Sequence, residues 1–590
     1  MPYRSPLQDM QFVLYDVLQA HRQWQQLPDF SAQLDRDTAD AMLAEAARLT
    51  EERIAPLNRS GDEEGAQWNN GVVTTPAGFV EAYRVWREGG FTALTGNPDF
   101  GGLGMPKALS VLVEEMLYAA NSSFALYPAL SVGACMSIDA HATDALKQRF
   151  LPKLYAGEWT GSMCLTESHS GSDLGLIRTK AVPNGDGTYA ISGTKIFITG
   201  GEQDLSDNII HMVLAKLPDA PAGSRGISLF LVPKIWVNED RSLGNHNGVS
   251  CGSIEHKMGI KASATCVLNF DGARGYLVGE ANKGLACMFT MMNCERLSIG
   301  IQGTGCAEMS YQNAVAYARE RLQGRDGNSG DKSRTADPII VHPDVRRMLL
   351  NIRSTTEGGR ALAVYLGMQL DLANHADSAE QRARADALVA LLTPVAKAFF
   401  TDQGLDSTVQ GQQVFGGHGY IREWGQEQLV RDARIAQIYE GTNGIQALDL
   451  VQRKVFANGG SSVDLFLAEV NDCAQQIGSA ALKPFAADVL QRSAQLQDLT
   501  HTLLDRGAAA PAELGAAACD YLQVLGYVTY AYLWLRMMGV AEQQKGNPFA
   551  VTKLKTGTYY FHRILPRVDS LIAAVRAGAG DIMAFSAEEF

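Results

Sequence analysis

A glutamate in an apolar and flexible setting is the first residue that suggests chemistry. Glu440 follows Ile438 and Tyr439 and precedes Gly441 in the segment R-D-A-R-I-A-Q-I-Y-E-G-T-N-G-I-Q, residues 431–446. Burial removes the water that solvates a carboxylate, so it raises the pKa toward the value that a general base needs near neutral pH. Because most glutamates are solvated surface residues, this interpretation requires support from the rest of the chain.

Two further segments are rich in glycine and hydroxyl groups. The first, M-C-L-T-E-S-H-S-G-S-D at residues 163–173, joins an apolar strand to a turn that offers N–H and O–H groups to an anion or a polar cofactor edge. The second, Q-V-F-G-G-H-G-Y at residues 413–420, would let the backbone approach a ligand closely. The alternatives are an ordinary turn after a strand and a glycine cap after a helix.

Several other chemistries are disfavoured. The sequence has no G-x-G-x-x-G, no G-x-x-x-x-G-K-[ST] and no H-E-x-x-H motif, which argues against a Rossmann dehydrogenase, a P-loop enzyme and a zincin. Its 9 cysteines form no C-x-x-C pair, so we predict a reducing compartment and no metal site. The net charge of −13 disfavours a nucleic-acid partner, because phosphate binding needs clustered basic residues.

The elements that must position these segments change in type along the chain. Helical periodicity up to about residue 157 gives way to short strands rich in β-branched and aromatic residues between 161 and 279. Helices return after residue 284 and are broken by a polar loop at 324–337, after which His342-Pro343-Asp344 is expected to open another helix with proline in its first turn. A further helical block follows the expected linker N-G-G-S-S at 458–462. At 590 residues, the chain is long enough for several domains.

The longest apolar run, Tyr521 to Ala541, contains Gln523 and Arg536, so a buried helix is favoured over a membrane span. The N-terminus leads from M-P-Y-R into polar residues without an apolar h-region or an Arg- and Ser-rich leader. We therefore expect a cytoplasmic protein without a transmembrane segment.

Taken together, the segments M-C-L-T-E-S-H-S-G-S-D and I-Y-E-G-T-N resemble the acyl-CoA dehydrogenase family, over most of residues 35–455. The resemblance implies an α+β fold and FAD bound between the β-domain and the bundle. It also implies that Glu440 removes the α-proton of an acyl-CoA thioester while the flavin takes the β-hydride. The expected domains are an N-terminal extension (1–34), a helical N-terminal domain (35–158), a central β-barrel-like domain (159–280), a C-terminal helical bundle (281–457) and an additional helical domain (458–590).

The resemblance also implies a set of ligand contacts. Residues bordering the flavin ring would be Cys164, Leu165, Thr166, Phe197 and Thr199, and those at the FAD pyrophosphate would be Ser172 and Thr442. Residues reaching the FAD of the neighbouring subunit would be Arg321, Gln323, Gln413, Gly416 and Gly417. Substrate contacts would come from Ser172, Asn293, Arg296 and Gly441. The family usually has tryptophan where Phe197 stands, and phenylalanine keeps the stacking face but loses the indole N–H.

The residues from about 459 onward resemble the extra helical domain of larger family members, in which it replaces a second dimer. We therefore predict a homodimer, with a domain serving only solubility or docking as the alternative. An electron-transfer flavoprotein is the expected acceptor, and an acyl-CoA oxidase or a silent acyl-CoA-binding scaffold are the rival functions. The substrate is expected to be a long- or medium-chain fatty acyl-CoA of β-oxidation, with 3-methylmercaptopropionyl-CoA as the alternative.

Overall fold

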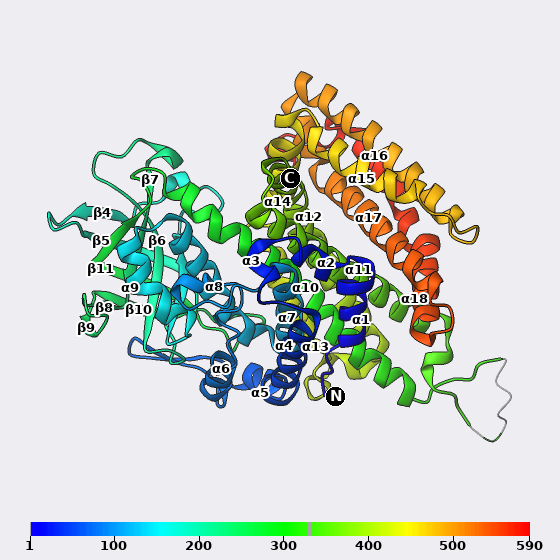
Figure 1. Ribbon diagram of the computed structural model, residues 1–590, viewed down its shortest axis with the longest axis horizontal. Coiled ribbons are helices and arrows are strands. Elements are labelled where there is room, and N and C mark those ends of the chain that lie inside the picture. The colour runs from blue at the N-terminus through cyan, green and yellow to red at the C-terminus, as the bar shows by residue number, and fades with distance from the viewer. Residues whose placement is uncertain (1, 328–332, 334) are drawn as a thin grey trace.

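The computed structural model describes residues 2–327, 333 and 335–590 (Figure 1). Strands between Trp159 and Val278 form a domain at one end of the molecule, and helices that precede and follow them make up the rest. The predicted α+β class and the order of helices, strands and helices are confirmed. The predicted polar loop 324–337 includes residues 328–332 and 334, which lie outside the described residues.

The N-terminal part is helical because its apolar residues recur on one face of each helix. In α4 (Arg36–Leu49), Leu43 and Ala46 are fully buried, and the Asp35 side chain caps the helix by accepting a hydrogen bond from the backbone N–H of Thr38 at 2.8 Å. The other helices here are α1 (Leu7–Gln11), α2 (Ala20–Trp24), α3 (Pro28–Ser31), α5 (Leu57–Glu64), α6 (Phe79–Glu88), α7 (Lys107–Ala120), α8 (Ser122–His141) and α9 (Asp144–Tyr155), with a small hairpin of β1 (Gln67–Asn69) and β2 (Val72–Thr74).

The central sheet closes on itself, as the predicted barrel-like domain requires. Its strands are β3 (Trp159–Cys164), β4 (Lys180–Pro183), β5 (Tyr189–Thr199), β6 (Asn208–Lys216), β7 (Ile227–Pro233), β10 (Val249–Ile254) and β11 (Thr265–Val278). The order is β10-β11-β5-β4-β6-β3, and β7 pairs with both β6 and β11, which joins the two sides of the sheet. A separate hairpin pairs β8 (Ile235–Val237) with β9 (Leu243–His246).

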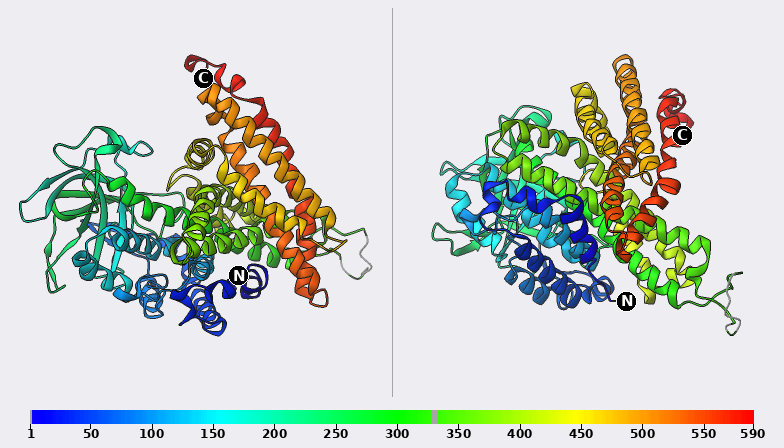
Figure 2. Two further views of the ribbon diagram at one scale, coloured as in Figure 1. Left: turned by 45° about the horizontal axis from the view of Figure 1, so that its top comes forward. Right: turned by 45° about the vertical axis from the view of Figure 1, so that its right-hand side comes forward.

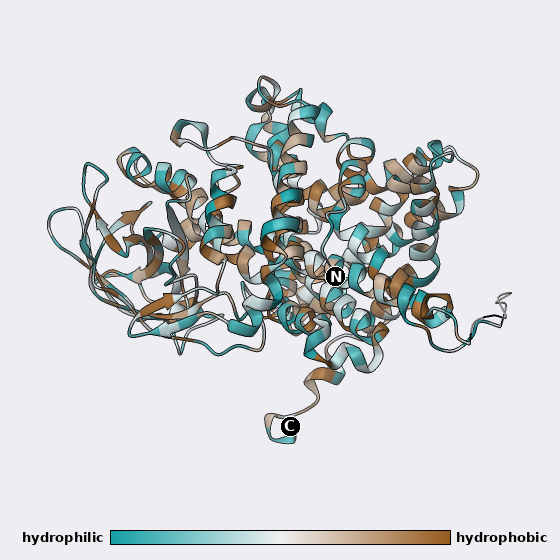
Figure 3. Cartoon of the chain, turned by 90° about the horizontal axis from the view of Figure 1, so that it is seen from below, coloured by the Kyte–Doolittle hydropathy of each residue, from teal (hydrophilic) through white to brown (hydrophobic). Residues whose placement is uncertain are grey.

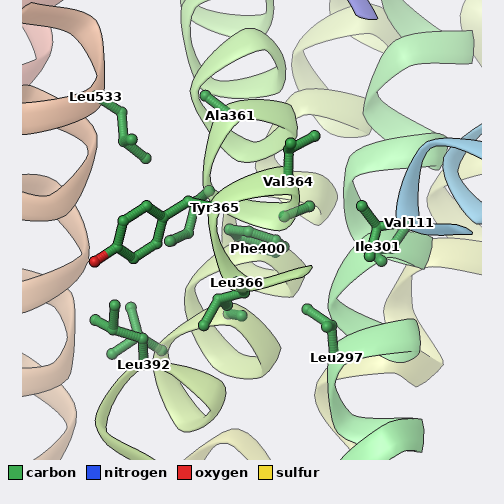
Figure 4. Packing of buried hydrophobic residues seen from close by; sticks show 14 of the residues in the cluster. Val111, Leu297, Ile301, Ala361, Val364, Tyr365, Leu366, Leu392, Phe400 and Leu533 are labelled. Carbon is green, nitrogen blue, oxygen red and sulfur yellow. The ribbon is translucent and has the colours of Figure 1, made fainter. Parts of the chain in front are cut away.

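Long helices form the bundle that follows: α10 (Gly284–Glu320), α11 (Pro343–His375) and α12 (Ala379–Val414), then α13 (Gln426–Arg434) and α14 (Asn443–Leu448). The helix expected to open with proline in its first turn begins at Pro343. One hydrophobic core joins α7, α10, α11 and α12 with a helix of the additional domain, and Figure 4 shows residues from all five. The labelled residues are Val111, Leu297, Ile301, Ala361, Val364, Tyr365, Leu366, Leu392, Phe400 and Leu533.

The additional domain consists of α15 (Ser461–Gln475), α16 (Lys483–Ala509), α17 (Pro511–Gln543), α18 (Pro548–Tyr559), α19 (Val568–Ala577) and α20 (Gly580–Met583). It lies against the bundle and away from the β-domain (Figure 2). The apolar run from Tyr521 falls inside α17 and is largely buried, as predicted. None of the described helices combines the length and apolarity that crossing a membrane requires. Hydrophilic residues interrupt the hydrophobic ones along the helices seen in Figure 3.

Candidate active site

A cleft of about 470 Å³ lies between the β-domain and the bundle. Its walls come from the end of β3 and the turn after it, from β5, from the first turns of α10, and from the loop that precedes α14. Segments separated by more than two hundred residues therefore meet in one place. Of the residues predicted from the sequence, those lining this cleft are Leu165, Thr166, Ser172, Phe197, Arg296, Glu440 and Gly441.

The backbone at Glu440 is held in an unusual conformation. Its φ angle is +55°, in the left-handed region that residues other than glycine rarely adopt, and Gly441 follows at +84°. Such a conformation costs on the order of 1–2 kcal/mol and persists only when surrounding contacts impose it. Thr442 then caps α14, because its hydroxyl accepts a hydrogen bond from the backbone N–H of Ile445 at 3.2 Å. The loop presents the Glu440 side chain to the cleft.

The surroundings of Glu440 give its carboxyl the proton affinity of a base. Burial raises its pKa to about 7, although the nearby cations of Arg296 and Lys397 act in the opposite direction. Lys397 has no solvent exposure and donates hydrogen bonds from Nζ to the carbonyl oxygen of Gly441 at 2.7 Å and to Oδ1 of Asn443 at 2.8 Å. A carboxyl with this pKa is partly ionised at neutral pH and can accept a proton from a bound ligand.

A second strained residue forms another wall of the same cleft. Phe197 has a φ angle of +60°, and 59% of its surface is exposed although it is a large aromatic residue. It lies in a β-bulge, where the pairing of β5 with β11 shifts register between Lys195 and Ile198. Bulges near active sites turn side chains out of the regular sheet, and an exposed aromatic face is a stacking surface for a planar ring.

The turn after β3 is fixed by a buried ion pair. Lys195, with no solvent exposure, donates hydrogen bonds to the carbonyl oxygen of Leu165 at 2.8 Å and to Oε1 of Glu167 at 2.9 Å. Burial opposes ionisation of Glu167, but the charge of Lys195 and hydrogen bonds from Thr179 and Arg178 outweigh it and lower the pKa to about 2. The turn that carries Thr166 is therefore tied to the strand that carries Phe197.

Some predicted residues lie elsewhere. Cys164 points into the core of the sheet, where burial raises the pKa of its thiol to about 12, so only its backbone is available to a flavin. Thr199 pairs with Thr265 at the end of β5, and the exposed Asn293 lies on α10, where its Oδ1 accepts a hydrogen bond from Arg296 Nη1 at 3.3 Å. None of the three lines the cleft, and their ligand roles stay predictions.

The residues predicted to reach a neighbouring subunit's FAD form a separate group. Arg321, Gln323, Gln413, Gly416 and Gly417 are all exposed, and none lines the cleft. Tyr317 and Phe415, which are close to these residues in the sequence, are buried and stacked, with ring centroids 4.2 Å apart. The large apolar side chains exposed beside them are those of Leu322, Tyr420, Ile421 and Trp424. This surface can take part in a site only if another molecule covers it.

A smaller cavity of about 50 Å³ lies between α7, α8 and α10 and is lined mainly by apolar residues, together with Glu114, Glu295 and Ser298. Glu295 is buried, and both its carboxyl oxygens lack a hydrogen-bond partner among the described residues. Burial, and then the charge of Glu440, raise its pKa well above the usual range, which favours the protonated form of the Glu295 carboxyl. Glu295 lines this cavity and the next residue, Arg296, lines the cleft, so the cavity lies close to the cleft.

Sequence reasoning missed Glu295, Lys195 and Lys397. Lys195 stands out as a charged residue inside the apolar strand predicted at 189–199, and Lys397 as one inside the apolar helical run V-A-K-A-F-F at 395–400. The signal for Glu295 was its position directly before Arg296. A charge in such a position is either paired or functional, because leaving it buried and alone is costly.

Comparison with known proteins gives matches along most of the chain. The N-terminal, middle and C-terminal domain models of acyl-CoA dehydrogenase match residues 36–158, 162–273 and 282–455, and the acetyl-CoA dehydrogenase C-terminal-like model matches 466–586. The chain is 42% identical to 3-methylmercaptopropionyl-CoA dehydrogenase of Ruegeria pomeroyi, covering 96% of each chain. It is 32% identical to the broad-specificity linear acyl-CoA dehydrogenase FadE5 of Mycobacterium tuberculosis, covering 98% of each.

A solved structure of similar fold is an acyl-CoA dehydrogenase from Bacillus anthracis in complex with FAD. The TM-score is 0.74 at 21% identity, and the match covers 94% of this chain and 90% of that one. At that identity the likeness concerns the fold alone.

Proposed function

The chain belongs to the acyl-CoA dehydrogenase family, and we propose that it converts saturated acyl-CoA thioesters to trans-2-enoyl-CoA with Glu440 as the general base. The observation that carries this proposal is the Glu440 carboxyl itself, with its pKa raised to about 7, in a cleft whose opposite domain presents the exposed ring of Phe197. A base and a stacking surface for a planar cofactor thus share one cleft.

The enzyme is a flavin-dependent oxidoreductase that uses FAD. The residues of the cleft fit that cofactor, because Phe197 offers an aromatic face and the turn 166–172 offers hydroxyl and backbone N–H groups. Bound FAD supplies a two-electron acceptor for the β-hydride. In this proposal Leu165, Thr166 and Phe197 hold the ring, and Ser172 and Thr442 contact the pyrophosphate.

Glu440 would take the proton from the carbon next to the thioester carbonyl. Desolvation of the carboxyl strengthens it as a base, and Arg296 and Lys397 keep enough positive charge nearby for it to remain ionisable. Arg296 lines the cleft with its Nε unpartnered among the described residues, which suits a ligand acceptor such as an oxygen of the CoA arm. Asn293, Ser172 and Gly441 are the other proposed CoA contacts.

The exposed surface formed by Arg321, Gln323, Gln413, Gly416 and Gly417 supports a homodimer. In this proposal it covers the FAD of a second copy, which would explain why polar side chains and large apolar ones are exposed together there. An electron-transfer flavoprotein is the proposed acceptor of the electrons.

The acyl group of the substrate has two candidates. A long- or medium-chain linear fatty acyl group agrees with the substrate class named for the FadE5 relative. A short acyl group such as 3-methylmercaptopropionyl agrees with the name of the other relative and with the cavity beside Glu295, whose 50 Å³ is well below the roughly 150 Å³ that holds a benzene molecule. The Glu295 carboxyl offers an O–H donor at this end in its protonated form, which burial favours because it raises the pKa.

The proposal is tested by mixing the purified FAD-loaded protein anaerobically with acyl-CoAs of four to sixteen carbons and with 3-methylmercaptopropionyl-CoA. Bleaching of the flavin and formation of the 2-enoyl product are expected, and kcat/KM values measured for the same thioesters with an artificial electron acceptor identify the acyl class. A protein that binds FAD but is not reduced by any of these thioesters would contradict the proposal. Peroxide formed in air in proportion to product would identify an oxidase.

A further inference from the structure

A half-buried polar network lies directly behind the loop that carries Glu440. Its centre is Asp402 of α12, whose Oδ1 accepts hydrogen bonds from the side-chain amides of Gln437 and Asn443, both at 2.7 Å. Gln437 lies three residues before Glu440 and Asn443 three residues after it. One carboxylate therefore holds both sides of the base loop.

The third donor to Asp402 comes from the additional domain. Gln523 of α17 donates from Nε2 to Oδ2 of Asp402 at 2.6 Å, across 121 residues of sequence. The network continues to Lys397, which bonds Asn443 and the carbonyl oxygen of Gly441. An unbroken series of hydrogen bonds thus runs from α17 through Asp402, Asn443 and Lys397 to the residue next to Glu440.

Helix α17 is seated firmly enough to act as a support. Gly526, one turn after Gln523, lies so close to Phe399 that an added Cβ atom would be 2.6 Å from the ring. Phe399 also packs edge-on against Tyr527 and Tyr530, with ring centroids 4.9 Å apart in each pair. Figure 4 shows Leu533, farther along α17, among the core residues of α11 and α12. The helix and the bundle therefore share one packed core.

We propose that Gln523 is a positioning residue for the dehydrogenation, and that the additional domain completes the catalytic site by holding the loop of Glu440 through Asp402, Asn443 and Lys397. The inference rests on the proposed role of Glu440 as the base. It assigns the additional domain a part in the reaction beyond solubility or docking.

The physical reason is the strained backbone of the loop. The left-handed conformation at Glu440 has to be imposed by surrounding contacts, and the hydrogen bonds at residues 437, 441 and 443 supply them. Losing the Gln523 amide removes the hydrogen bond to Oδ2 of the half-buried Asp402 and lets the loop relax. A displacement of about 1 Å at a reacting group slows a reaction by as much as about 100-fold without a comparable effect on ligand affinity.

The test compares Gln523→Met, which keeps the length of the side chain but removes the amide, with Tyr527→Phe as a matched control. Tyr527 lies one turn further along α17 and accepts a hydrogen bond from Gln403 at 3.3 Å, in the same interface but outside the network. The readouts are the rate constant of anaerobic flavin reduction, the Kd of acyl-CoA, the FAD content and the Tm. We expect Gln523→Met to reduce flavin about 10-fold more slowly with a Kd within about twofold of the parent, and Tyr527→Phe to match the parent.

A Gln523→Met enzyme that holds FAD and is reduced at the parental rate would overturn the inference. If that variant does not fold, Asp402→Asn keeps the volume of the side chain but replaces one acceptor oxygen with an amide donor, and the same loss is expected. Where both variants fold, the double variant should reduce flavin no more slowly than the slower single variant, because both changes interrupt one series of hydrogen bonds. Additive losses of activation free energy in the double variant would contradict this. Glu440→Gln is measured in parallel, because parental reduction of that variant refutes the base itself, a failure distinct from that of Gln523.

Discussion

Replacing Glu440 by glutamine removes the proposed base with the least disturbance of the site. The glutamine side chain has nearly the same volume, and the positive φ angle and the hydrogen bonds of Lys397 to the loop are unaffected by the change. At pH 8, one unit above the pKa of about 7, roughly nine-tenths of the native carboxyl is ionised and able to accept the α-proton. The amide cannot accept it. We expect flavin reduction to slow by about 10³-fold, which corresponds to roughly 4 kcal/mol in activation free energy.

The assay is stopped-flow reduction of bound FAD by acyl-CoA in the absence of oxygen, with the Kd of acyl-CoA taken from the dependence on its concentration. Glu295→Gln is the matched control, because it replaces a buried carboxyl near Glu440 whose raised pKa favours the protonated form. Its rate should stay within about 10-fold of the parental rate, since an amide is uncharged like the protonated acid that burial favours there. Rapid reduction in Glu440→Gln together with a collapse in Glu295→Gln would refute the assignment and make Glu295 the base.

Three further outcomes follow from the same contacts. A base works only when deprotonated, so the rate of flavin reduction should rise as the pH passes about 7, and a rate that does not change with pH would contradict this. Lys397→Met should move the midpoint of this rise to higher pH, because it removes a cation that favours the carboxylate. Phe197→Ala should lose FAD during gel filtration, whereas the Tm of its FAD-free form should equal that of the FAD-free parent. Full retention of FAD would argue against stacking. Arg360 is buried and ion-paired with Glu115, so Arg360→Met should lower the free energy of unfolding, measured by urea titration, by about 3–5 kcal/mol. Replacing the exposed Arg84 by methionine should change it little. An unchanged urea midpoint in the Arg360 variant would show that the buried pair is dispensable.

Local sequence was informative wherever local rules decide structure. The period of the apolar residues distinguished helices from strands, and the proline after His342 marked the first turn of α11. The motif residues Leu165, Thr166 and Ser172, together with Phe197, were predicted beside one ligand and do line one cleft. Spacing along the chain did not reveal that the side chain of Cys164 enters the core of the sheet, because the pleat directs alternate residues to opposite faces.

By itself the sequence determined the family, the cofactor class and the residue proposed as the base, because these depend on short motifs whose backbone conformation is local. Only the tertiary structure decided which distant groups act on that residue. Lys397 and Asp402 lie about forty residues from Glu440 and Gln523 lies more than eighty residues beyond it, yet they meet in one hydrogen-bonded network. The pKa of a carboxyl and the conformation of its loop depend on the water excluded and the charges brought near when the chain folds, and no local pattern records them.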